Sequence, residues 1–272
     1  MTNNTVIDEF RVCQAALSQP YLRTTFNNQN NPSAYVTPGP ECREFTWLGE
    51  YSTAWTNAMN WAGGQVPSSS NDVYFAANSL NCALASSSAC KKLTTEGFTN
   101  VLSLGTNNLA VTGDLLHSGG TIQIGISAGT GMDVTGSISN SATISCAGAS
   151  RIFCAGNWIN NGTFTPDIST VTFDGSSQIS GSTVTAFSNL TVSGTLTAPA
   201  GTMRVAGVFE NNGTFDHNSG TVEFNGTSSV TGTSASAFNA ITISGTLAAP
   251  VGTMSIAGNL VNNGTFTPGA GT

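Results

Sequence analysis

The residues best suited to acid–base chemistry are seven carboxylates spread thinly over the chain from Asp114 onwards. They are Asp114, Asp133, Asp167, Asp174, Glu210, Asp216 and Glu223. A glycoside hydrolase needs two such groups on one face, about 5 to 10 Å apart. Asp174 and Glu223 stand near equivalent positions of a 51-residue internal repeat, but they are offset by two residues, and Asn225 occupies the true equivalent of Asp174. The pattern therefore predicts no working carboxylate pair.

Other catalytic signatures are missing from the sequence as well. No Ser-His-Asp order, phosphate-binding loop or clustered metal-binding set occurs, and Arg204 and His217 stand isolated. We therefore expect that the chain is not an enzyme and that it needs no cofactor.

Cysteines offer a different chemistry. The chain contains six of them: Cys13, Cys42, Cys82, Cys90, Cys146 and Cys154. An even number in a chain of extracellular composition favours disulfide bonds. Closeness in sequence suggests three pairs, the last by elimination, although other pairings are open: Cys82 with Cys90, Cys146 with Cys154, and Cys13 with Cys42. Buried free thiols are the alternative. Because no C-x-x-C occurs and His117 and His217 are the only histidines, we expect no metal site.

Composition limits the classes of partner. Charged residues make up 8% of the 272-residue chain, against roughly 25% in an average soluble domain. The net charge of -7 argues against nucleic-acid binding, which relies on clustered Lys and Arg. No apolar stretch reaches about 18 residues, so we expect no membrane span. The first residues lack the pattern of a secretory signal, which suggests a processed chain, a fragment, or assembly in the cytoplasm.

The strongest signal in the sequence is an internal repeat. The segment Asn160–Phe164 reads NNGTF and recurs at Asn211–Phe215 and Asn262–Phe266. The ungapped 51-residue units cover residues 153–203, 204–254 and, in part, 255–272. Segments such as Thr170–Phe173 alternate apolar with small polar residues, as half-buried strands do, and Gly-containing turns separate them.

Such short strands bury a face only if successive coils stack on one another. We therefore predict an all-β fold, a right-handed parallel β-helix, or β-solenoid. A β-propeller is the main alternative, but two and a third units do not close a ring. Degenerate copies of the pattern begin at Leu109, Met132 and Phe153. We interpret their spacing as two coils of about 25 residues per unit, or about seven coils and 30 to 35 Å of rod from Val101 onwards.

Stacked coils would place equivalent residues above one another. Asparagine amides in such a column form hydrogen-bonded ladders, and phenylalanine rings stack in the core. Two sets of residues are expected to line up along the axis in this way: Asn161, Asn212 and Asn263, and Phe164, Phe215 and Phe266.

The region before the repeats divides into two parts. Residues 1–44 are polar and contain prolines, so we predict an irregular N-terminal arm that lies along a neighbour or remains a flexible tail. Residues 45–100 contain Trp47, Trp55 and Trp61, whose spacing fits no helix face. We expect them to fill the end of the coil stack as a Trp-rich cap within the first coils, although aromatic clusters also bind sugars. Residues 101–272 complete the solenoid.

Several motifs between Phe45 and Thr272 carry a family resemblance. The order W-x-G, S-x-x-W, N-W, G-x-V-P and D-V-x-F, followed by TVTFDGSSQISG and FSNLTVSG, resembles β-solenoid repeat modules of large secreted surface proteins and adhesins of Bacteroidetes-type bacteria. The resemblance implies export, extracellular display at the cell surface and often filament or matrix formation. This sequence departs from those proteins in having no signal peptide and no C-terminal sorting domain.

Three functional hypotheses follow. The last unit stops after a third of its length, so the array is either cut from a longer one or meant to be covered by the next subunit. The first hypothesis is a structural subunit of an extracellular bacterial filament or surface fibre, a homo-oligomer that polymerises head to tail through exposed solenoid ends. The second is an adhesin or phage-type fibre module that binds a glycan or other cell-surface ligand through side-facing aromatics. The least favoured is a carbohydrate-active β-helix enzyme.

Overall fold

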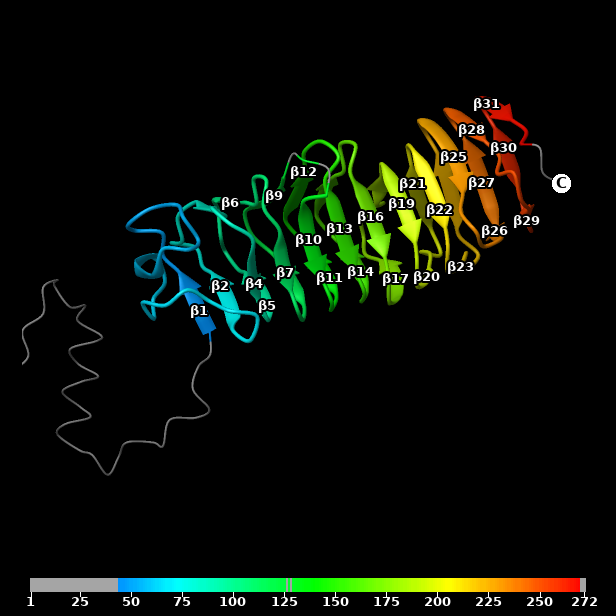
Figure 1. Cartoon of the computed structure of the whole chain (residues 1–272). Coiled ribbons are helices and arrows are strands. Elements are labelled where there is room, and N and C mark those ends of the chain that lie inside the picture. The colour runs from blue at the N-terminus through cyan, green and yellow to red at the C-terminus, as the bar shows by residue number, and fades with distance from the viewer. Residues whose placement is uncertain (1–43, 126, 128, 270–272) are drawn as a thin grey trace, which may run out of the picture. The chain divides into compact units, whose positions relative to one another are not determined.

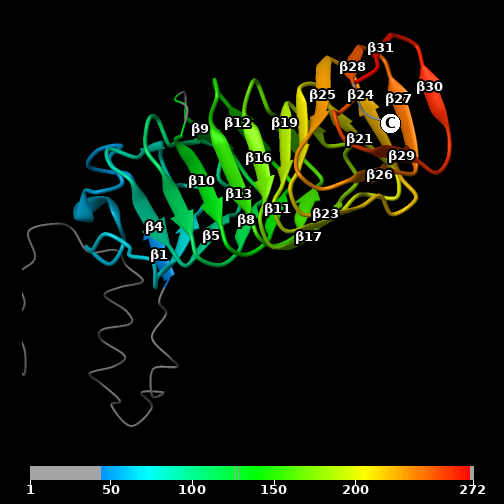
Figure 2. The same ribbon diagram turned by 45° about the vertical axis from the view of Figure 1, so that its right-hand side comes forward.

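The structure, a computed structural model, describes residues 44–125, 127 and 129–269. The chain divides into two units, Met1–Arg43 and Glu44–Thr272, and the predicted arm falls outside the described residues except for Glu44. The second unit is a rod of short parallel strands that follow one another from β1 to β31 (Figure 1 and Figure 2). Helix in this described part is limited to one 3₁₀ turn, η2 (Ala58–Asn60). The predicted all-β parallel solenoid is confirmed.

From β2 onwards each turn of the rod contributes one strand to each of three faces, which we number in chain order, while the first turn contributes β1 alone. Face 1 holds β1 (Glu44–Trp47), β2 (Asp72–Phe75), β5 (Lys92–Thr95), β8 (Leu115–His117), β11 (Ile138–Asn140), β14 (Trp158–Asn160), β17 (Ser176–Ser180), β20 (Thr195–Thr197), β23 (Thr214–Asp216), β26 (Ser236–Phe238) and β29 (Met254–Ile256). Face 2 holds β3 (Cys82–Ala83), β6 (Val101–Ser103), β9 (Thr121–Ile124), β12 (Thr143–Cys146), β15 (Thr163–Thr165), β18 (Ala186–Phe187), β21 (Thr202–Val205), β24 (Thr221–Phe224), β27 (Ala240–Ile243) and β30 (Leu260–Asn262).

Face 3 is a single continuous sheet of ten strands within the described residues. It holds β4 (Ser88–Cys90), β7 (Leu109–Val111), β10 (Gly131–Val134), β13 (Arg151–Cys154), β16 (Thr170–Phe173), β19 (Asn189–Val192), β22 (Val208–Asn211), β25 (Thr227–Thr231), β28 (Thr246–Ala248) and β31 (Thr265–Thr267). At about 4.8 Å per strand, the described rod is about 48 Å long.

The alternating sequence explains why the strands form and which side they bury. In β16, Val171 and Phe173 are buried while Thr170 and Thr172 face outwards, and most four-residue strands repeat this pattern. Successive side chains of a strand point to opposite faces, so every second residue enters the interior. The apolar residues of the three faces thus meet in one continuous core along the axis.

The turns are shorter than the sequence analysis predicted. On face 3, Met132 lies directly opposite Leu109 of the preceding turn, and Leu190 lies opposite Val171. These registers show that one turn is shorter than the predicted length of about 25 residues. A 51-residue unit therefore contains more than two turns, and the prediction of two coils per unit is wrong. Stacking also begins before Val101, since β1 already pairs with β2 and β2 with β5. About ten turns result instead of seven.

The sequence repeat and the structural turn do not coincide. One 51-residue unit contains eight strands, β13 to β20, whereas one turn uses three. A unit therefore spans two and two-thirds turns, and equivalent strands rotate from face to face. The equivalent strands β13, β21 and β29 accordingly lie on faces 3, 2 and 1.

Candidate functional site

The described cysteines form no disulfide bond. Four free and buried thiols occur in the part of the chain that the structure describes: Cys82, Cys90, Cys146 and Cys154. The predicted Cys82–Cys90 and Cys146–Cys154 bonds are therefore wrong, and the predicted pair of Cys13 with Cys42 lies outside the described residues.

The thiols serve as core side chains. Cys154 occupies an inward position of β13, directly between Val134 and Phe173 of the neighbouring turns. Burial raises the pKa of the Cys90 and Cys154 thiols to about 12. They are consequently protonated at neutral pH, and a protonated thiol is a poor nucleophile and metal ligand. The even number of cysteines does not reflect pairing among these four.

The three NNGTF segments lie at three different corners of the rod. The first joins β14 to β15 between faces 1 and 2, the second joins β22 to β23 between faces 3 and 1, and the third joins β30 to β31 between faces 2 and 3. Because a unit spans two and two-thirds turns, equivalent residues are never superposed. The predicted columns are therefore wrong for both sets, Asn161, Asn212 and Asn263, and Phe164, Phe215 and Phe266.

The second asparagine of the motif instead fastens its corner to the next turn. The Asn161 Oδ1 atom accepts a hydrogen bond from the Ser182 backbone N–H at 2.9 Å, and Asn212 accepts one from Thr233 at 3.0 Å. The recurring motif thus builds the same local corner in each of these units.

A polar ladder does form between residues one turn apart. Asn140 and Asn160 are opposite residues of β11 and β14, and the Asn140 side-chain amide donates to Asn160 Oδ1 at 3.0 Å. His117, one turn earlier, lies with Nδ1 2.8 Å from the Thr95 hydroxyl and Nε2 2.9 Å from the Thr143 carbonyl oxygen. A neutral ring that donates from Nε2 and accepts at Nδ1 satisfies both contacts. Burial lowers the pKa of His117, and the bond to Thr143 partly opposes the shift.

Three tryptophans close the N-terminal end of the rod. The Trp61 ring centroid lies 4.9 Å from that of Trp47 and 4.7 Å from that of Trp55, in both cases edge to face. All three rings contact Phe75 on β2 and are almost completely buried. Trp61 also bridges to Trp47 on β1, so the cap covers part of the edge of the first strand.

A buried amide holds the cap in place. Asn60, at the end of η2, is fully buried. Its Oδ1 atom accepts hydrogen bonds from the backbone N–H groups of Tyr51 and Ser52, and its Nδ2 atom donates to the Ala54 carbonyl. One side chain thereby satisfies backbone groups of a loop that lies outside the named strands.

The last described turn has no such cover. Leu260 in β30 and Phe266 in β31 occupy the repeat positions of Phe209 and Phe215, which are 0% and 8% exposed. In the last turn the corresponding side chains are 48% and 36% exposed. Core positions thus stand open to solvent at this end of the described rod.

The carboxylates Asp174 and Glu223, which stand near equivalent repeat positions, lie on different parts of the rod. Glu223 lies on face 2, where its Oε2 atom is 2.7 Å from Arg204 Nε, whereas Asp174 follows β16 at the corner of faces 3 and 1. Burial, and secondarily the Asp174 charge, raise the pKa of Asp133. This influence of the Asp174 charge on Asp133 was not predicted, because the registers that place Asp133, Phe153 and Thr172 side by side follow only from the true turn length.

Face 3 carries an elongated groove. Two hollows of about 260 and 440 Å³ share Arg151 and Phe153, the outward residues of β13. The smaller hollow extends over β10 and β7, and the larger one extends to β22. The larger hollow is otherwise lined by polar or charged residues and one valine: Thr170, Thr172, Asn189, Thr191, Ser193, Val208 and Glu210. The smaller one is more apolar, and its lining adds Asn108, Leu109, Ala110, Gly129, Thr130, Gly131, Met132 and Asp133. This surface combines an aromatic ring with both signs of charge.

A signal for this groove is visible in the sequence. In the β13 sequence RIFC, Ile152 and Cys154 occupy the alternate positions that point into the core, so Arg151 and Phe153 must face outwards. An aromatic residue at an outward position breaks the pattern of Thr, Ser and Asn on the same face. In the sequence analysis Phe153 only marked the start of a repeat unit, and the direction in which its side chain faces was not considered.

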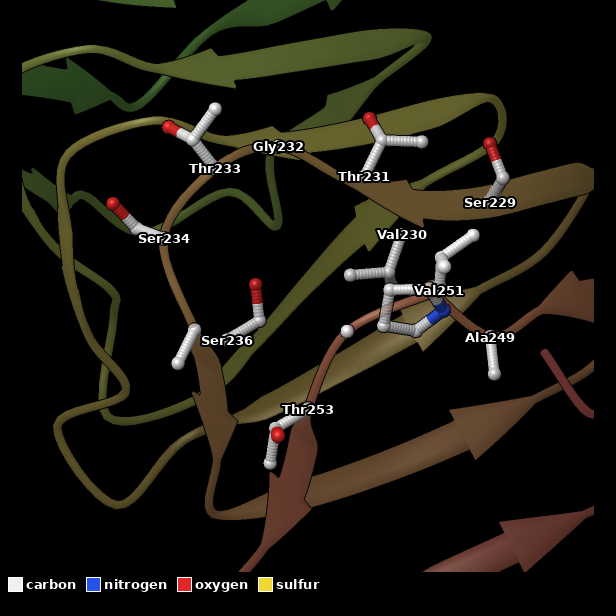
Figure 3. A pocket seen from close by; sticks show the side chains of 13 residues that line it. Ser229, Val230, Thr231, Gly232, Thr233, Ser234, Ser236, Ala249, Val251 and Thr253 are labelled. Carbon is white, nitrogen blue, oxygen red and sulfur yellow. The ribbon is translucent and has the colours of Figure 1, made fainter. Parts of the chain in front are cut away.

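A second type of hollow recurs at equivalent positions of successive repeat units. A pocket of about 490 Å³ lies between the loop of Thr231–Ser236 and the loop of Ala249–Thr253 (Figure 3). Every residue that lines a smaller pocket of about 240 Å³, between Ile179 and Thr202, has its counterpart one repeat later in this lining. The glycines at the bend, Gly181 and Gly232, have φ values of 117° and 112°, which disfavour other residues. These pockets therefore follow from the fold of each unit.

Metal-ligating side chains do not gather in the described part of the chain. Within it, no three His, Cys, Asp or Glu side chains come together in a way that could hold a metal ion. No helix among the described residues is long and apolar enough to cross a membrane. Comparisons of the chain with family models, with curated proteins and with solved structures find no match.

Proposed function

We propose that this chain is a non-catalytic structural subunit of an extracellular bacterial filament or surface fibre, and that copies join head to tail. The observation that carries the proposal is the distribution of exposed apolar side chains. Eight of the twelve large exposed ones in the described residues lie near the two ends: Tyr51, Met59, Val66 and Leu80, and Val251, Leu260, Val261 and Phe266. Apolar surface gathered in this way is typical of an interaction site.

The last described turn exposes a surface that a partner of matching chemistry would cover. Its exposed side chains carry no charge and include the apolar Leu260, Val261 and Phe266 among Asn and Thr residues. The strands β29, β30 and β31 have no partner on their outer side within the described chain. The cap of a second copy offers Tyr51, Met59 and Leu80, which are 61%, 56% and 50% exposed. Because the two surfaces differ, their contact is heterologous and repeats without closing, which yields a filament.

The side walls are consistent with a structural role. Outward positions are mainly Thr, Ser and Asn, and the strands of face 3 stack without interruption from β4 to β31. The sheets of faces 1 and 2 are each interrupted once, between β23 and β26 and between β15 and β18. Each turn contacts only its neighbours, so a rod of this kind extends by adding equal steps. The resemblance to repeat modules of secreted surface proteins supports a location outside the cell.

Electron microscopy and sedimentation velocity of the 272-residue chain over rising concentration test the proposal. We expect filaments whose axial step is at least about 48 Å, the height of about ten turns. Leu260→Lys and Met59→Lys place an ammonium in the contact, so each should raise the concentration needed for assembly at least about tenfold.

Ile168→Lys is the matched control, because Ile168 is equally apolar and 59% exposed but lies between β15 and β16, far from both ends of the rod. It should leave assembly unchanged. A chain that stays monomeric at every concentration, or an equal effect of all three lysine variants, would contradict head-to-tail assembly.

A further inference from the structure

We propose that the groove on face 3 binds a neutral glycan that lies along the rod, with Phe153 as the platform for one sugar ring. The groove lies on the side of the rod, so this inference does not depend on assembly through the ends. It reaches from β7 to β22, five strand spacings or about 24 Å. That length suits a linear oligosaccharide of several units.

Phe153 departs from the pattern of its column. The residues in register with it on face 3 are Asp133 before it and Thr172 and Thr191 after it. The equivalent residue of the next unit is Arg204, on face 2. Phe153 does not belong to the buried core cluster and remains half-buried on the outer surface. Departures of this kind from a regular pattern are expected at functional sites.

The guanidinium of Arg151 is available to a ligand. Arg151 is exposed, and within the described residues it forms no ion pair and its side chain makes no hydrogen bond. Its five N–H donors can therefore be offered to hydroxyl groups. Its neighbour in register is Gly131, where a Cβ atom would collide with the Arg151 carbonyl oxygen. The absence of a side chain there allows the backbones of β10 and β13 to approach closely beside the hollow.

The charges around Phe153 favour a neutral ligand. Arg151, two residues before Phe153 on β13, and Asp133, in register with Phe153 on β10, carry opposite charges and form no ion pair with each other. The chain as a whole carries a net charge of -7, which repels polyanions. The remaining lining supplies hydroxyl and amide groups such as Thr170, Asn189 and Thr191. An apolar platform bordered by a few convergent polar groups is the usual form of a small-ligand site.

NMR of the isotope-labelled chain tests this assignment directly. The probes are neutral hexasaccharides of β-1,4-linked glucose, xylose, mannose and N-acetylglucosamine, with oligogalacturonate as the acidic comparison. At least one neutral probe should shift amide signals of β10, β13, β16, β19 and β22 and leave those of faces 1 and 2 unchanged. Measurement in Leu260→Lys, which is designed not to assemble, separates lateral binding from end-to-end assembly.

Variants then identify the platform. Phe153→Thr gives β13 the residue found in register on β16 and β19, so it preserves the fold while removing the ring. It should weaken binding at least tenfold, and Arg151→Thr should also weaken it. Arg204→Thr, the repeat equivalent of the Phe153 position on face 2, is the control and should have no effect.

Three results would overturn the inference. They are no localised shift with any neutral probe, equal affinity of Phe153→Thr and the unmodified chain, and tighter binding of oligogalacturonate than of every neutral probe.

Discussion

The two ends of the described rod differ in how the apolar core is covered. At the first turn, the chain folds Trp55 and Trp61 over the core and fastens the loop through Asn60. At the last turn, Leu260 and Phe266 occupy core positions but remain exposed. A solenoid turn buries its apolar face only against another layer. The chain itself supplies that layer at one end, whereas at the other end it must come from outside the described residues.

The difference also concerns side-chain size. One repeat position holds Trp158, Phe209 and then Leu260 in successive units, and the first two are fully buried. The Trp158 and Phe209 rings each contact a phenylalanine of the following turn, Phe187 and Phe238 respectively. The aromatic core therefore depends on the next turn being present, and each described unit except the last has one.

The largest expected effect is at the closed end. Trp61→Ala removes a ring that is 2% exposed and contacts both other tryptophans. It should lower the free energy of opening the first turns by about 3 to 5 kcal/mol. Hydrogen exchange of the Val73 and Phe75 amides, compared with Ile241 and Ile243, measures the loss locally.

Tyr51→Ala is the control for the cap. Tyr51 belongs to the same loop but is 61% exposed, so its removal should change stability by less than about 0.5 kcal/mol. If Trp61→Ala proved as mild as Tyr51→Ala, the closed end would not depend on the tryptophans.

The next effect compares one motif residue in two environments. Phe215 is 8% exposed and its ring lies 5.0 Å from Phe209 and 5.6 Å from Phe238. Phe215→Ala should cost about 3 kcal/mol or more, while Phe266→Ala should cost less than about 1 kcal/mol in the monomer. Chemical denaturation at low protein concentration measures both. Equal costs would mean that the last turn is covered in solution even in the monomer.

Much of the fold could be predicted from the sequence because it depends on the alternation of apolar and polar residues within each strand. The pattern of Thr170–Phe173 specified strands, and the 51-residue repeat specified stacking. The turn length was misjudged because the repeat was assumed to contain a whole number of turns. The spacing of Leu109, Met132 and the β13 segment in the sequence was already the true turn length, as their registers show.

The candidate sites were harder to predict from the sequence than the fold, because they depend on which residues of neighbouring turns lie next to each other. An asparagine ladder exists, but it joins Asn140 to Asn160 at one turn rather than Asn161 to Asn212 at one repeat. The outward direction of the Phe153 side chain could be predicted from the alternation within its strand alone. Its neighbours Asp133 and Thr172 could be assigned only with the correct register.

Acid should weaken the part of the rod nearer the closed end. Burial lowers the pKa of His117 below its ordinary value of 6.5, so below about pH 6.5 the unfolded chain binds more protons than the folded chain. The stability contributed by the neutral ring is present above that pH and is lost as the pH falls toward the folded pKa. Hydrogen exchange around Thr95 and Thr143 should report the loss.

His117→Asn provides the matching control, because it extends the Asn140–Asn160 ladder by one residue. This variant should remove the acid sensitivity that begins below about pH 6.5 while retaining the fold. Acid sensitivity that persists unchanged in His117→Asn would assign it to other groups.

The smallest effect concerns a surface ion pair toward the open end. Arg204 and Glu223 are in register on β21 and β24, and their column continues through Thr242 to the exposed Val261. Hydrogen bonds from Arg204 and then from Ser244 lower the pKa of Glu223. The pair therefore adds stability above about pH 4.5, which is lost as the carboxylate is protonated. Since the Arg204 side chain is 43% exposed, Glu223→Gln should cost only about 0.5 kcal/mol, and less in high salt. A cost like that of Phe215→Ala would mean that charge, rather than covering of the apolar core, decides how firmly the last turns are held.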